Sequence, residues 1–310
     1  MGHQTRACLY ALATVLCWST VAAAFKLSLR YLPPHELLLY SSAVALAVLG
    51  AWLAVQGKLG GVTGSARGGY GRSALLGALN PCLYYLVLFA AYDRLPAQVA
   101  QPLNYTWAIT LALLSIPLLG QRIGWRDLGA AGVCYSGAAV ICTGGDLGGW
   151  RATDPLGVAL ALGSTVIWAL YWIYNTKDRR DPVVGLFWNF AFGVPLVLLY
   201  GLVGPGLSRP SPQGLLGAAW VGLFEMGIPF VLWLRALRCS ENTAKVGNLI
   251  FLSPFLSLVF IHFAVGEQIE PSTVAGLGLI VGGLLLQRAP GGSAPSKPGE
   301  EAEEAGEGVG

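Results

Sequence analysis

Charged residues are scarce in this 310-residue chain. Asp, Glu, Lys and Arg make up 11% of it and apolar residues 55%, whereas about a quarter of an ordinary soluble domain is charged. Together with a mean hydropathy of +0.60, this composition excludes a soluble globular protein and predicts an all-α membrane protein embedded in a lipid bilayer. The basic residues form no patch with interleaved aromatic residues, so we expect no nucleic-acid partner.

Residues that carry catalysis or bind metals are equally few. The three histidines, His3, His35 and His262, lie far apart and in no metal-binding motif. The six cysteines lie in or beside apolar segments without a CxxC pair, which favours a role as small apolar fillers. A G-x-S-x-G nucleophile motif is also missing from the sequence. We therefore expect no enzymatic activity, no metal and no cofactor.

Long apolar runs are what the chain has instead. Ten of them are joined by short loops, and several approach the lower limit of about 17 residues for a membrane span. The runs cover residues 8–29, 36–55, 73–92, 96–119, 128–143, 155–176, 183–203, 213–236, 242–265 and 271–287. After Arg288 the composition changes to Gly, Pro, Ser and Glu, which predicts a disordered acidic tail over residues 290–310.

The basic residues predict which side of the membrane each loop faces, because Lys and Arg concentrate on the cytoplasmic side. With a cytoplasmic amino terminus, thirteen of the nineteen basic residues fall on the inner side, five on the outer side, and Lys245 within a run. The inner set is Arg6, Lys58, Arg67, Arg72, Arg122, Arg126, Lys177, Arg179, Arg180, Arg235, Arg238, Arg288 and Lys297. The outer set is Lys26, Arg30, Arg94, Arg151 and Arg209. Both termini are therefore predicted to be cytoplasmic.

The second half of the chain repeats features of the first. LLGAL at 75–79 resembles LLGAA at 215–219, AQPLN ending at Asn104 resembles AKVGN ending at Asn248, and GQRI at 120–123 resembles GEQI at 266–269. Each half holds five runs, an odd number, so two copies would cross the membrane in opposite orientations, as in many secondary transporters. We predict two inverted five-helix repeats, residues 1–146 and 147–289. Small residues predicted to allow close helix packing are Gly129, Gly132, Ser136, Gly278 and Gly282.

This five-plus-five pattern resembles the EamA branch of the drug/metabolite transporter superfamily from about residue 9 to residue 287. Within it, VLCWST at 15–20, LNYTW at 103–107, GQRIGW at 120–125 and IWALYW at 167–172 look like the bacterial aromatic amino acid exporters. The resemblance implies a multi-pass transporter of the bacterial cytoplasmic membrane that exports aromatic or other amphiphilic amino acids or related small metabolites. Two alternative functions stay open: a drug or organic-cation transporter of the same superfamily, and a non-transporting receptor. A homodimer also stays open as the oligomeric state.

Polar and aromatic residues interrupt the run at 96–119, where lipid makes polar side chains costly. Gln101, Asn104 and Tyr105 share one helical face by their i, i+3, i+4 spacing, and Trp107 flanks them. Pro102 lies among them and removes a helical hydrogen bond, so we expect a kink. A kinked helix with a polar, aromatic face indicates a substrate pathway.

Similar residues occur in other runs. Trp168, Tyr171, Trp172 and Asn175 form a second stripe that favours either a cavity lining or an aromatic belt at the membrane interface. Single polar or aromatic residues in the other runs, such as Trp18, Asn80 and Tyr84, could instead serve in helix packing. The predicted substrate-binding residues are Trp18, Asn80, Tyr84, Gln101, Asn104, Tyr105, Trp107, Trp168, Tyr171 and Asn248, the last as the repeat counterpart of Asn104.

Glu225 is the one carboxylate far from the end of an apolar run, and Lys245 is the one basic residue inside a run. An ionisable residue within a membrane span indicates function by default. Three roles for Glu225 stay open: carrying a proton that couples transport, pairing structurally with Lys245, and contacting the ammonium group of a substrate.

The loop charges generate a test of the ten-span arrangement. Reporter fusions after Gln56, Gly145 and Pro290 are expected to report cytoplasmic, outer and cytoplasmic locations, because each span reverses the side of the chain. An outer location after Pro290 would contradict an even number of spans.

Overall fold

The computed structural model describes residues 3–58, 60, 69–120, 124–146, 154–240 and 243–288. All regular structure in these residues is helical. Eight helical stretches are long and apolar enough to cross a membrane, and each coincides with a predicted run. They are His3–Ser28, Pro34–Val55, Tyr70–Arg94, Ala97–Leu119, Pro155–Asn175, Pro182–Val203, Pro212–Cys239 and Val246–Val265. The chain is therefore a multi-pass, all-α membrane protein.

In chain order the helical elements are α1 (His3–Ser28), α2 (Pro34–Val55), α4 (Tyr70–Gly77), η2 (Ala78–Leu83), α5 (Tyr84–Arg94), α6 (Ala97–Tyr105), α7 (Trp107–Leu119), α8 (Trp125–Cys142), α9 (Pro155–Asn175), α10 (Pro182–Val203), α11 (Pro212–Val221), η3 (Gly222–Gly227), α12 (Ile228–Cys239), α13 (Thr243–Asn248), η4 (Leu249–Phe251), α14 (Leu252–Phe260), η5 (Ile261–Val265) and α15 (Pro271–Arg288). The runs at 128–143 and 271–287 form α8 and the shorter apolar helix α15, which fall outside the eight stretches. The predicted tail at 290–310 and four residues of the loop-charge prediction lie outside the described residues: Arg67, Arg122, Arg151 and Lys297.

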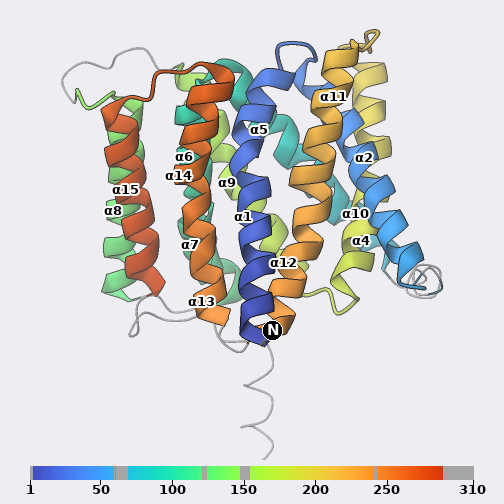
Figure 1. The fold of residues 1–310 in the computed structure, drawn as a ribbon, viewed down its shortest axis with the longest axis horizontal. Coiled ribbons are helices and arrows are strands. Elements are labelled where there is room, and N and C mark those ends of the chain that lie inside the picture. The colour runs from blue at the N-terminus through green and yellow to red at the C-terminus, as the bar shows by residue number, and fades with distance from the viewer. Residues whose placement is uncertain are drawn as a thin grey trace, which may run out of the picture.

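The helices stand side by side in one bundle (Figure 1). α1 packs against α12 and α14, α2 against α10, and α9 against α5 and α7, while α8 and α15 pair at one edge. α1 begins and α15 ends at the same end of the bundle, which is the lower end in Figure 1. We call this the N-terminal end and the other the opposite end.

Local sequence fixes where several helices of the second half begin. Asp154, Asp181 and Ser211 precede α9, α10 and α11, and each side chain accepts a hydrogen bond from a backbone N–H of the first turn. Each is followed by proline, whose missing N–H and fixed φ suit the first helical position. These three helices therefore start where capping rules predict.

Four apolar stretches are interrupted within the bundle, one of them Val246–Val265, where the 3₁₀ segment η4 separates α13 from α14. η2 lies between α4 and α5, and η3 lies between α11 and α12, both as π-helical segments. The stretch that contains Pro102 is divided at Thr106, about one turn after the proline, so the predicted irregularity is present. These interruptions leave Asn80 and Glu225 in irregular segments, and Tyr84 at the start of the helix that follows η2.

Close packing of α8 on α15 depends on two glycines that face each other. A Cβ atom added to Gly137 would lie 2.5 Å from the Gly276 carbonyl oxygen, and a Cβ on Gly276 would lie 2.5 Å from that of Gly137. The sequence pattern predicted close helix packing at five different small residues of these helices. That prediction was wrong, because the five lie on faces turned away from the partner helix. Gly129, Gly132, Gly278 and Gly282 have no neighbouring atom within 4 Å of an added Cβ, and Ser136 is exposed.

Replacing Gly137 with alanine is expected to destabilise the protein by about 1–3 kcal/mol, because the added methyl group meets backbone atoms. The matched control is Gly132→Ala, since Gly132 lies on the same helix with open space around it. Thermal unfolding of detergent-purified protein measures the difference. Equal melting temperatures for the two variants would contradict the reciprocal glycine contact.

Candidate functional site

A cavity of about 430 Å³ lies between the helices. Its lining includes residues of α1, α5, α6, α7, α9, α10, η3 and α12. Eight of the ten predicted substrate-binding residues line it, namely Trp18, Tyr84, Gln101, Asn104, Tyr105, Trp107, Trp168 and Tyr171. Glu225 lines it as well. Residues far apart in the sequence are therefore gathered at one site.

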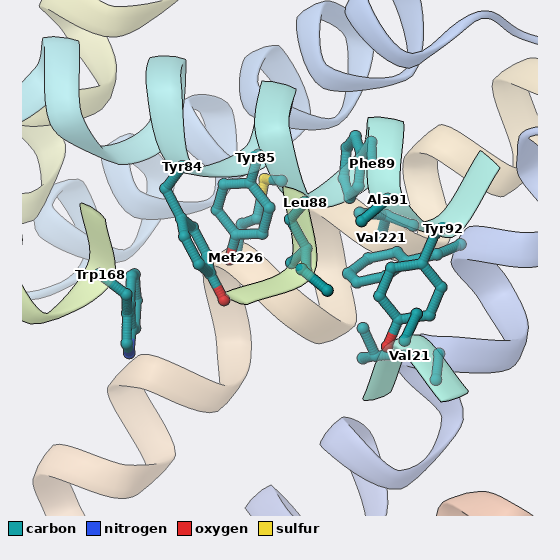
Figure 2. Packing of buried hydrophobic residues seen from close by; sticks show 14 of the residues in the cluster. Val21, Tyr84, Tyr85, Leu88, Phe89, Ala91, Tyr92, Trp168, Val221 and Met226 are labelled. Carbon is teal, nitrogen blue, oxygen red and sulfur yellow. The ribbon is translucent and has the colours of Figure 1, made fainter. Parts of the chain in front are cut away.

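An aromatic stack forms one part of the cavity lining. The Trp168 indole is stacked on Tyr84 with ring centroids 4.4 Å apart, and on Tyr171 at 5.4 Å. Trp107 meets the same indole edge-on at 6.5 Å. Figure 2 shows Tyr84 of α5 beside Trp168 of α9. Such ring pairs each contribute about 0.5–1.5 kcal/mol beyond the burial of their area, so the stack holds α5 and α9 together.

Amide groups lie beside this stack. The Asn104 Oδ1 accepts a hydrogen bond from the Tyr84 hydroxyl at 3.3 Å, and its Nδ2 donates to Ser164 Oγ at 3.0 Å. Gln101 Oε1 and Trp172 Nε1 are buried without a hydrogen-bond partner among the described residues. An unsatisfied buried polar atom costs about 1–3 kcal/mol. A ligand that reached these two atoms would bind with a gain in free energy.

Glu225 is half-buried at the cavity. The Tyr85 hydroxyl donates a hydrogen bond to its Oε1 at 3.0 Å, and the Trp18 indole N–H donates to its backbone oxygen at 3.4 Å. None of the ion pairs among the described residues involves Glu225. Lys245 belongs to α13, but its side chain lies outside the described residues. The geometry thus assigns Tyr85 and Trp18 as the neighbours that hold this residue.

The remaining predicted residues lie elsewhere. Asn80 is buried in η2 and does not line the cavity, and Asn248 is exposed in α13. The α9 stripe lines the cavity over its full length, Trp172 and Asn175 included. Sequence reasoning missed Tyr92, Phe230 and Trp233, although the last two have an i, i+3 spacing that could have revealed them.

At the opposite end of the bundle, hydrogen bonds join α6 to the segment before α15. The Glu267 carboxylate accepts hydrogen bonds from the backbone N–H groups of Ala97 at 2.7 Å and Gln98 at 3.0 Å. The Gln98 side chain donates to the Gln268 carbonyl at 2.8 Å and accepts from the Glu270 N–H at 2.9 Å. A carboxylate at a helix N-terminus is also favoured by the helix dipole. We call these four hydrogen bonds the closed-end contacts.

Two basic residues strengthen the same end. Lys26 donates from Nζ to the carbonyls of Tyr92 and Leu95 at 2.7 and 2.8 Å. Arg94 pairs with Asp154 at 2.9 Å, and its hydrogen bond is the main cause of the lowered pKa of the Asp154 carboxyl. These contacts connect the ends of α1, α5 and α9.

At the N-terminal end, the cavity lining continues almost to the end of the helices. It includes Asn175, the last residue of α9, and Pro182, the first of α10. The loop between them bonds to the segments around α2 and α4, through Asp181 with Lys58 and the Lys177 carbonyl with Arg72. The cavity lining therefore reaches the N-terminal end of the bundle, and the closed-end contacts join helices at the opposite end.

An apolar helical bundle with a polar and aromatic cavity between its helices is typical of a membrane transporter. Comparison with known families makes this specific. The pattern of the EamA-like transporter family matches the chain over residues 5–143 and again over residues 155–288. The chain belongs to this family, and the resemblance inferred from the sequence is confirmed.

Several known proteins are similar over most of the chain. The aromatic amino acid exporter YddG of Ancylobacter novellus is 26% identical, over 91% of this chain and 97% of its own. A probable terminal-alkyne amino-acid exporter of Streptantibioticus cattleyicolor is 28% identical, over 69% of this chain and 71% of its own. A solved crystal structure shares the fold with a TM-score of 0.61 at 22% identity, over 92% of this chain and 96% of that chain.

Proposed function

We propose that this protein is a secondary transporter that exports amphiphilic amino acids, aromatic ones among them, across the bacterial cytoplasmic membrane. The observation that carries the proposal is the stack of Trp168 with Tyr84 and Tyr171 at the edge of a large cavity. A flat apolar side chain can extend such a stack, and the amides of Gln101 and Asn104 lie where its polar head would be. The exporters named among the similar proteins support this substrate class.

The architecture proposed with this function has ten spans in two inverted repeats, residues 1–146 and 147–289. Helices α8 and α15 supply the two spans beyond the eight long apolar stretches. Two separate family matches support a repeat. Tyr85 and Glu225 support it too, because each follows the first residue of its LLGA segment by ten residues and the two are hydrogen-bonded. Interrupted helices at corresponding positions of two halves are typical of binding sites in transporters.

Transport would then proceed by alternating access. Both termini are proposed to be cytoplasmic from the loop charges, and with them the side to which the cavity opens. A substrate enters from that side, stacks on Trp168, and leaves after the closed-end contacts break and the N-terminal end closes. The Glu267 and Gln98 hydrogen bonds must be exchanged for bonds to water in this step, at modest net cost.

The aromatic stack generates a transport prediction. Trp168→Ala is expected to lower phenylalanine flux into proteoliposomes several-fold, because loss of a ring contact of about 0.5–1.5 kcal/mol weakens binding by roughly 2–12-fold. Trp168→Phe should retain more flux than Trp168→Ala. Trp125→Ala is the matched control, since Trp125 is 89% exposed and lies outside the cavity lining.

Flux is compared at equal amounts of reconstituted, monodisperse protein. Wild-type flux in a Trp168→Ala, Tyr171→Ala double variant would contradict the proposed binding site.

A further inference from the structure

Glu225 gives the cavity its charge. Among the described residues that line the cavity, it is the one Asp or Glu, and no Lys, Arg or His is present. The other polar lining groups are amides, phenols and indoles, which are neutral. An ionised Glu225 therefore has no partner of opposite charge in the described part of the lining.

The surroundings of Glu225 suit a bound ammonium group. Tyr85 occupies Oε1 as a donor, while Trp18 bonds to the backbone oxygen and leaves the carboxylate to other partners. Phe230 and Trp233 pack around the Trp18 ring, with centroids 6.1 and 5.9 Å from it. A carboxylate among aromatic faces is the arrangement that recognises organic ammonium ions, by ion pairing and by cation–π attraction.

The carboxylate of an amino acid finds no comparable partner in the described part of the lining. The buried donor without a partner at the lining is the neutral Trp172 indole N–H, and Gln101 can contribute a neutral amide. A zwitterionic substrate also leaves the net negative charge of Glu225 unchanged, whereas a cationic amine neutralises it. The difference favours a substrate with an amine and without an acid group.

We propose that Glu225 binds the protonated amine of the substrate and that the cavity accepts aromatic amines without a carboxylate at least as well as the corresponding amino acids. This inference rests on the proposed transport function and adds the chemical group by which the site selects. It assigns Glu225 to substrate contact among the three roles that the sequence left open.

Three probes with the same phenyl ring separate the contributions of amine and acid: phenethylamine, phenylalanine and phenylpropionate. Binding is followed by the fluorescence of the tryptophans at the cavity, and transport by counterflow in proteoliposomes. Wild-type protein is expected to bind phenethylamine at least as tightly as phenylalanine. It should bind phenylpropionate more weakly by about tenfold or more, because phenylpropionate lacks an amine for the charge-assisted bond to Glu225.

Variants then test whether Glu225 contacts the amine. Glu225→Gln is expected to weaken phenethylamine binding by about tenfold or more while changing phenylpropionate binding little or raising it. Glu225→Asp keeps the charge and should retain part of the preference for the amine. Asp93→Asn is the matched control, since it makes the corresponding carboxylate-to-amide change on an exposed residue outside the cavity. If Glu225→Gln does not fold, the ranking of the three probes on wild-type protein remains the test.

The possible failures are distinct. Wild-type protein that transports phenylalanine but neither binds nor moves phenethylamine would overturn the inference and leave the transport function standing. Equal binding of phenethylamine by wild type and Glu225→Gln would overturn it as well, and would return Glu225 to a structural or proton-carrying role. If none of the three probes binds or moves with folded wild-type protein, both the inference and the proposed function fail.

Discussion

Polar side chains inside an apolar bundle must find partners, and in this protein many find them across the two halves of the chain. Asn104 bonds to Ser164, Tyr85 to Glu225, and Thr110 to Thr165 at 3.0 Å. An unpaired polar group in lipid costs several kcal/mol, so these bonds determine how the halves fit together. Asn104 and Glu225, from two of these pairs, also line the cavity.

The same constraint accounts for the closed end. Glu267 and Gln98 come from different halves, and together they bond to backbone groups that begin one helix and precede another. Because the partners are backbone groups at helix ends, the contact can be broken without unfolding a helix, and water can replace it at the membrane surface. Opening this end therefore requires relative movement of the helices rather than a change within them.

Much of this was predictable from the sequence. The apolar runs and the i, i+3, i+4 spacing of Gln101, Asn104 and Tyr105 depend on helix geometry alone, and both appear in the structure. What the sequence could not predict depends on contacts between distant residues. Ser164 and Gly137 look like many other small residues until their partners are known, and the role of Glu267 depends on a helix start 170 residues away. Asn80 and Asn248 do not line the cavity, because Asn80 is buried elsewhere in η2 and Asn248 is exposed in α13. Neither the helical periodicity nor the repeat predicts these positions.

The central claim is the proposal that the cavity opens at the N-terminal end and is closed at the other. The most direct measurement uses a membrane-impermeant thiol reagent on vesicles of known orientation, with the six native cysteines replaced. Cysteine at Ala108, which lines the cavity, should react from the side that carries the N-terminus and be protected by phenylalanine. Cysteine at the exposed Asp93, at the opposite end, should react from the other side without protection. Reaction of the Ala108→Cys protein only from the Asp93 side, with phenylalanine giving no protection, would contradict the account.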